Sequence, residues 1–224
     1  MNNDDRTGVG EKETLGSMRR AVVTMSVGFG VFLTALAFSS QLLWLRRPFS
    51  SLFGAENLAV SIITGAAAGV IAAAMALIVV HRMPGLRGFR RLVRDGFEGI
   101  EPRLIDLLLI SLVAGWSEEL FFRGVLQQQV GIWIASVAFV LVHGVHRVRS
   151  RGGIALVTFL YVASVGLGTL YRWFGLESAM AAHAAYDLAV LLGLREMLNH
   201  GMWVEARGVE RAGSSDHGPP SSRQ

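Results

Sequence analysis

Long apolar runs constrain this chain more than any other feature of its sequence. Residues 21–45 are nearly free of charge, and residues 58–80 contain no charged side chain. A run of about 20 apolar residues is long enough to cross the hydrocarbon core of a bilayer as an α-helix. Charged residues make up only 17% of the chain, whereas soluble domains average about 25%. We therefore expect an integral membrane protein.

The apolar segments predict an all-α fold, a polytopic membrane bundle of about six transmembrane helices. The expected spans are 21–45, 58–80, 104–126, 130–145, 154–174 and 178–198. In the loop 81–103, apolar residues recur at helical spacing with arginines between them, which predicts an amphipathic interfacial helix before the third span, although a solvated connector also fits. Residues 1–18 and 201–224 are polar, and we expect them to be disordered tails around a transmembrane domain at 19–200.

Basic residues orient the chain. All but one of the 21 basic residues are arginine, and most lie in the two tails and in the loops 81–103 and 146–153. Because cytoplasmic segments carry the excess of positive charge, both termini are expected in the cytoplasm. The arginine-rich composition favours a GC-rich genome and hence a bacterial plasma membrane. Arginines that lie between spans, and not on one face, argue against a nucleic-acid partner. The absence of cysteine excludes disulfides and thiolate chemistry.

Three charged residues interrupt the third apolar segment. A charged side chain at the bilayer centre costs about 2.5–3.5 kcal/mol, so Glu118, Glu119 and Arg123 must face a protein interior or a wet cavity. Residues four apart share a helix face, so Glu119 and Arg123 are expected to form a salt bridge. Glu118 points elsewhere and has no partner on its own helix, which makes it the candidate for function.

Two later segments also carry polar residues at membrane depth. Phe139 and His143 are four apart, so the phenyl ring is expected to pack beside the imidazole. A histidine on an apolar helix is more often a satisfied core residue than a catalyst. His183 and Asp187 are also four apart, which fits either a local hydrogen bond or a shared site. Because such groups avoid lipid by converging, the three segments together predict one site made of a glutamate, two histidines and an aspartate.

Small residues in the second apolar segment indicate close helix packing. Gly65 and Gly69 form the sequence GAAAG. Small residues at this spacing let two membrane helices approach closely. We expect this pair to serve packing and not chemistry.

The three polar motifs, in this order, resemble the CPBP intramembrane proteases, the Abi family that includes the Rce1-type CAAX prenyl endopeptidases. The family pattern is EExxxR, then FxxxH, then HxxxN or HxxxD, on successive helices. This sequence has Glu118-Glu119-x-x-x-Arg123, Phe139-x-x-x-His143 and His183-x-x-x-Asp187. Each motif alone is weak, but the ordered set is specific. The resemblance covers residues 86–198.

The resemblance implies an intramembrane endopeptidase that acts on a membrane-anchored protein or peptide. Glu118 and His143 would activate the hydrolytic water, and His183 and Asp187 would stabilise the oxyanion. Glu119, Arg123 and Phe139 would support the site structurally, in agreement with the helix geometry. No cofactor is expected.

Asp187 departs from the asparagine that is common in the family. An amide donates hydrogen bonds, whereas an ionised carboxylate does not, so Asp187 would be protonated, orient His183 or help to bind a metal. Glu118, His143, His183 and Asp187 also offer the ligands of a zinc site. The sequence is compatible with both a metal-free and a metal-dependent reaction, and the resemblance favours the metal-free one.

Two other functions fit the same sequence. A non-catalytic member of the family could act as a bacteriocin self-immunity or regulatory protein. Glutamate and histidine at membrane depth also occur in small transporters and proton relays, but the sequence shows no inverted repeat.

Overall fold

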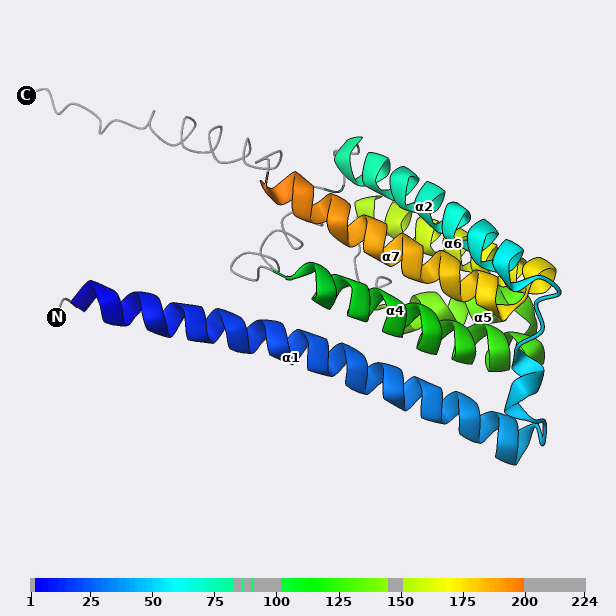
Figure 1. Cartoon of the computed structure of the whole chain (residues 1–224). Coiled ribbons are helices and arrows are strands. Elements are labelled where there is room, and N and C mark those ends of the chain that lie inside the picture. The colour runs from blue at the N-terminus through cyan, green and yellow to red at the C-terminus, as the bar shows by residue number, and fades with distance from the viewer. Residues whose placement is uncertain (1–2, 83–85, 87–89, 91–101, 145–150, 200–224) are drawn as a thin grey trace, which may run out of the picture.

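The computed structural model describes residues 3–82, 86, 90, 102–144 and 151–199. Its α-helices are α1 (Asn3–Ser39), α2 (Leu58–Arg82), α4 (Leu104–Phe121), α5 (Gln127–Val142), α6 (Arg151–Phe174) and α7 (Leu176–Asn199). Two π-helical turns, η1 (Ser40–Trp44) and η4 (Phe122–Leu126), and the 3-10 turn η2 (Phe49–Leu52) complete the assigned elements. The described part of the chain contains no strand, so the predicted all-α bundle is confirmed (Figure 1).

Four stretches of the described residues are long and apolar enough to cross a membrane. They are Gly16–Trp44, Leu58–Arg82, Leu104–Val142 and Gly153–Phe174. Large apolar side chains such as Met25, Ile63 and Trp173 are exposed on the outside of the bundle, as expected for a surface in contact with lipid. The chain is therefore an integral membrane protein.

The predicted number of six spans is not confirmed. The stretch Leu104–Val142 merges the third and fourth expected spans into one apolar segment. Helix α7, which holds the sixth expected span, is not among the four stretches that qualify within the described residues. It carries Glu177, Asp187, Arg195 and Glu196, which make it more polar than α2 and α4.

The segment Leu104–Val142 reverses direction and does not form one straight helix. Gly131 has φ 78° and ψ 169°, a conformation that essentially only glycine adopts. In a continuous helix, residues 118 and 143 would lie about 37 Å apart, because each residue adds about 1.5 Å. The Glu118 carboxylate instead lies 3.5 Å from the His143 ring. The break at Gly131 therefore turns the chain so that the end of α5 returns to α4, which brings Glu118 and His143 together.

Helix α7 is held closely between α2 and α4 (Figure 1). A Cβ atom at Gly65 or Gly69 of α2 would collide with the backbone of Ser178 or Ala182 on α7. On the other side, a Cβ atom at Gly115 of α4 would lie 2.8 Å from the backbone of α7. The expected packing role of the GAAAG sequence is thus confirmed, and the packing fixes the position of α7, and with it His183, relative to α2 and α4.

Helix α1 packs against α4 and begins at the same end of the bundle as that at which α7 ends (Figure 1). Arg19 on α1 and Asp106 on α4 form an ion pair of 3.5 Å. The structure continues α1 outward to Asn3, whereas we expected residues 1–18 to be a disordered tail. A helix that is already nucleated by an apolar span extends into flanking residues without a second nucleation cost. The expected tail 201–224 and most of the expected interfacial helix in 81–103 lie outside the described residues.

Candidate active site

Glu118 and His143 face each other from different helices. Glu118 lies near the end of α4, and His143 caps the end of α5. The Oε2 atom of Glu118 lies 3.5 Å from Nε2 of His143, and their side chains are 14% and 32% exposed. The other ring nitrogen, Nδ1, lies 2.8 Å from the Phe139 carbonyl oxygen. Because a carbonyl only accepts, Nδ1 carries the hydrogen, and the lone pair of a neutral ring is on Nε2, toward Glu118.

Glu119 and Arg123 form the predicted salt bridge in the core of the bundle. Arg123 Nε donates to Glu119 Oε2 at 2.8 Å, and both side chains are fully buried. Arg123 Nη2 also donates to the hydroxyl of Ser164 on α6, at 2.9 Å. A buried charge without a partner costs several kcal/mol, so the Glu119 carboxylate and the Arg123 guanidinium each need the other to be stable in the core.

Glu119 has a second partner that the spacing of the motifs did not reveal. His183 Nδ1 lies 2.8 Å from Glu119 Oε1. Since the buried carboxylate accepts hydrogen bonds, Nδ1 of His183 carries the hydrogen. The opposite nitrogen, Nε2, lies 3.5 Å from Asp187 Oδ2, which confirms that the two side chains share one face of α7. His183 is therefore held between two carboxyl groups.

Phe139 lies at the centre of the polar residues. Its ring stacks on the His143 imidazole, with centroids 4.2 Å apart, as expected from their spacing. It also contacts the His183 ring edge-on at 5.9 Å, and the Arg123 guanidinium lies over its face at 5.4 Å. The Phe139 ring thus contacts both histidine rings and lies between the two catalytic candidates. The predicted convergence of α4, α5 and α7 is present in the structure.

A π-helical turn adjoins the buried salt bridge. Turn η4 contains Arg123 and Gly124, and such turns occur frequently at functional sites. The Gly124 carbonyl accepts hydrogen bonds from the side chains of Gln41 at 3.2 Å and Gln128 at 2.7 Å. These glutamines anchor the turn to the end of α1 and to the start of α5.

The described residues do not provide a metal site as they are placed. No group of three or more histidine, aspartate or glutamate side chains among them is arranged to hold a metal ion. Glu118 lies 3.5 Å from His143, and His183 lies 3.5 Å from Asp187.

Sequence reasoning missed two contributors to this site. Ser164 lies in an apolar helix, and no spacing rule connects it with Arg123. The contact between Glu119 and His183 joins residues 64 positions apart. The only local signal was the presence of small polar residues in an otherwise apolar span, which often mark contacts between membrane helices.

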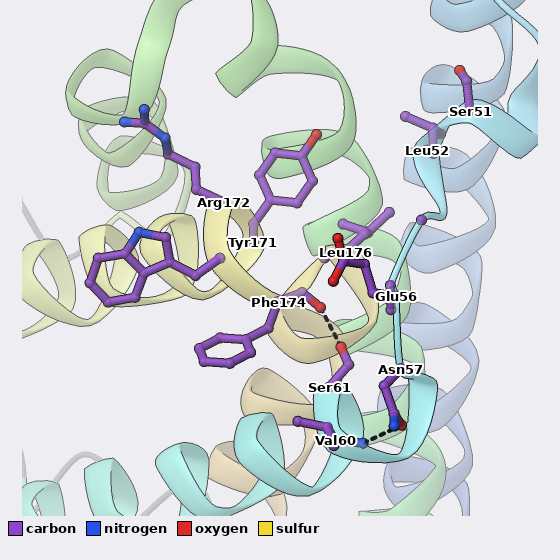
Figure 2. Close-up of a pocket in the computed structure, with 14 residues that line it drawn as sticks. Ser51, Leu52, Glu56, Asn57, Val60, Ser61, Tyr171, Arg172, Phe174 and Leu176 are labelled. Carbon is purple, nitrogen blue, oxygen red and sulfur yellow. Dashed lines mark hydrogen bonds between the residues drawn. The ribbon is translucent and has the colours of Figure 1, made fainter.

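A pocket of about 700 Å³ lies at another place in the bundle, between the loop that precedes α2 and the turn that joins α6 to α7 (Figure 2). Two hydrogen bonds order its wall, from Ser61 Oγ to the Phe174 carbonyl and from the Val60 amide to Asn57 Oδ1. None of the seven predicted site residues lines it. It is therefore separate from the candidate active site.

Comparison with known proteins agrees with the motifs. Residues 100–189 match the family model described as type II CAAX prenyl endopeptidase Rce1-like. This segment contains all seven predicted site residues. The resemblance drawn from the sequence is thus confirmed.

One curated protein is also similar to this chain. The uncharacterized protein YpbD of Bacillus subtilis (strain 168) is 33% identical over 92 residues, which cover 40% of this chain and 46% of that protein. The matched segment thus spans about half the length of this relative. No solved structure matches the chain.

Proposed function

We propose that this protein is an intramembrane endopeptidase that hydrolyses a peptide bond of a membrane-anchored protein or peptide. The observation that carries the proposal is the 3.5 Å approach of the Glu118 carboxylate to His143 Nε2. Both side chains are partly exposed, whereas the neighbouring pair of Glu119 and Arg123 is fully buried. An acid–base pair that is held in place beside a fixed, buried support suits the activation of water.

Glu118 and His143 act together on the water. With the hydrogen of His143 on Nδ1, both Nε2 and the Glu118 carboxylate are acceptors, so a water molecule beside the pair can donate one O–H to each. As the water oxygen attacks the carbonyl carbon, one water proton passes to this pair. The same proton then moves to the amide nitrogen, and the C–N bond breaks. The products are a new carboxyl group and a new amine.

His183 supplies the charge that stabilises the tetrahedral intermediate. Glu119 fixes the Nδ1 hydrogen, so Nε2 is the atom that is free to donate to the oxyanion. This donation requires an imidazolium ring, whose charge the Asp187 carboxylate balances from 3.5 Å. In this arrangement Asp187 orients and neutralises His183 and does not itself donate to the oxyanion. A donor aimed at an oxyanion is typically worth about 2.7–4 kcal/mol.

Comparative membrane proteomics tests the proposal. Membranes from cells that express the wild-type protein are compared with membranes from cells that express Glu118→Gln, which keeps the size of the side chain and removes the base. We expect C-terminal fragments of one or more membrane proteins to disappear in Glu118→Gln and in His143→Ala. Glu56→Gln, at an exposed position that is remote from the site residues, is the matched control and should keep the fragments.

The alternative of a non-catalytic immunity or regulatory protein makes the opposite prediction. Identical fragment patterns for the wild type and for Glu118→Gln, at equal protein levels, would contradict the proposed peptidase activity. A protective or regulatory effect that survives Glu118→Gln would then identify the non-catalytic function.

A further inference from the structure

Ser164 contacts Arg123 but has no role in the proposed mechanism described above. It lies on α6, is fully buried, and accepts a hydrogen bond of 2.9 Å from Arg123 Nη2. None of the seven predicted site residues lies on α6. Through this one hydroxyl group, α6 reaches the polar centre formed by α4, α5 and α7.

The hydroxyl group of Ser164 fixes the plane of the guanidinium. Arg123 contacts Glu119 through Nε alone, at 2.8 Å, which is a single hydrogen bond and not a two-pronged pair. A single bond allows the planar group to swing about the contact, whereas a second bond from Nη2 prevents that motion. The remaining nitrogen, Nη1, is buried and has no hydrogen-bond partner among the described residues. Ser164 is therefore the second point of attachment.

The fixed guanidinium in turn fixes the carboxylate that holds His183. Arg123 holds Oε2 of Glu119, and the other oxygen of the same rigid group, Oε1, lies 2.8 Å from His183 Nδ1. A rotation of the guanidinium would rotate the carboxylate and tilt the imidazole. We propose that Ser164 is a positioning residue that sets the orientation of the His183 ring through Arg123 and Glu119. Its effect on cleavage rests on the proposed peptidase function, whereas its effect on the ring does not.

Histidine nuclear magnetic resonance of the full-length protein in detergent tests the effect on the ring. The protein is labelled with ¹⁵N-histidine, and the His183 signals are assigned by their loss in His183→Gln. We expect a protected Nδ1–H signal from His183 in the wild type, because this nitrogen is bonded to the buried Glu119 carboxylate. In Ser164→Ala we expect the signal to shift or to exchange rapidly with water.

Ser136→Ala is the matched control. Ser136 is also fully buried in a membrane helix, but its hydroxyl oxygen has no hydrogen-bond partner among the described residues. The His183 signal should therefore stay unchanged in this variant. Ser164→Cys, which keeps nearly the same volume with a poor acceptor, should move the signal as Ser164→Ala does and serves if the alanine variant does not fold. An unchanged His183 signal in a folded Ser164 variant would overturn the proposal.

Cleavage gives a second and separable measurement. If the peptidase function is correct, Ser164→Ala should lower the yield of the fragments that depend on Glu118 by about tenfold to a hundredfold, because a small misplacement of a catalytic group has effects of this size. Ser136→Ala should leave that yield at the wild-type level. Absence of any Glu118-dependent fragment would count against the peptidase function, while the signal of His183 would still decide the role of Ser164.

Discussion

The Oε1 atom of Glu119 lies 2.8 Å from Nδ1 of His183, although these residues are 64 positions apart in the chain. Its neighbour Glu118 faces the other histidine, His143, at 3.5 Å. Successive residues of an α-helix point about 100° apart, so two adjacent glutamates on α4 reach two different helices. Glu119 belongs to a fully buried network, whereas Glu118 is partly exposed. The two carboxylates should therefore respond differently to substitution.

Removal of the Glu119 carboxylate should destabilise the protein. In Glu119→Ala the buried Arg123 guanidinium loses its counter-charge, and the loss of one partner of a buried pair typically costs about 3–5 kcal/mol. We expect a clearly lower midpoint of thermal unfolding in detergent and lower yield in the membrane. Glu56→Ala, at an exposed position, is the control and should unfold like the wild type. Equal unfolding midpoints for Glu119→Ala and the wild type would mean that the salt bridge does not support the bundle.

Close packing between α2 and α7 should not tolerate a methyl group. In Gly69→Ala the new Cβ atom meets the backbone of Ala182, next to His183, so the helices must move apart. Overpacking of this kind costs about 1–3 kcal/mol. Gly166→Ala is the matched control, because a Cβ atom there meets nothing within 4 Å. Thermal unfolding should show a loss of stability for Gly69→Ala only, and an equal effect of both changes would contradict the packing.

The reversal at Gly131 should depend on its backbone conformation and not on space. A Cβ atom at Gly131 meets nothing within 4 Å, yet φ is +78°. Non-glycine residues in such a conformation carry strain of about 1–3 kcal/mol. Gly131→Ala should therefore unfold at lower temperature than the wild type, again with Gly166→Ala as the control. A fully stable Gly131→Ala protein would show that α4 and α5 are joined in another way.

The absence of cysteine allows a direct test of orientation. Single cysteines are introduced at Pro102, which precedes α4, at Gln129, near the reversal, and at Glu56, in the loop before α2. We expect a membrane-impermeant maleimide added to intact cells to label Gln129→Cys and Glu56→Cys, and to label Pro102→Cys only after the membrane is opened. This pattern follows from cytoplasmic termini. The reverse pattern would place both termini outside.

Local patterns determined much of this protein. Apolar runs specified membrane helices, because a backbone in lipid must satisfy its own hydrogen bonds. Residues four apart specified the pairs of Glu119 with Arg123, Phe139 with His143 and His183 with Asp187, because positions at this spacing share a helix face. The GAAAG sequence indicated a close helix contact for the same reason. These features depend on neighbours within one helix, so the sequence is sufficient to predict them.

Only the tertiary structure decided which helices meet and what each polar group contacts. The reversal at Gly131 brings Glu118 to His143, and no rule of helix periodicity could predict it. Ser164 on α6 reaches Arg123 in η4, and Glu119 on α4 reaches His183 on α7, because whole helices pack at particular distances from one another. The physical reason is that these contacts join residues far apart in the chain, whose approach depends on the packing of whole helices and not on local spacing.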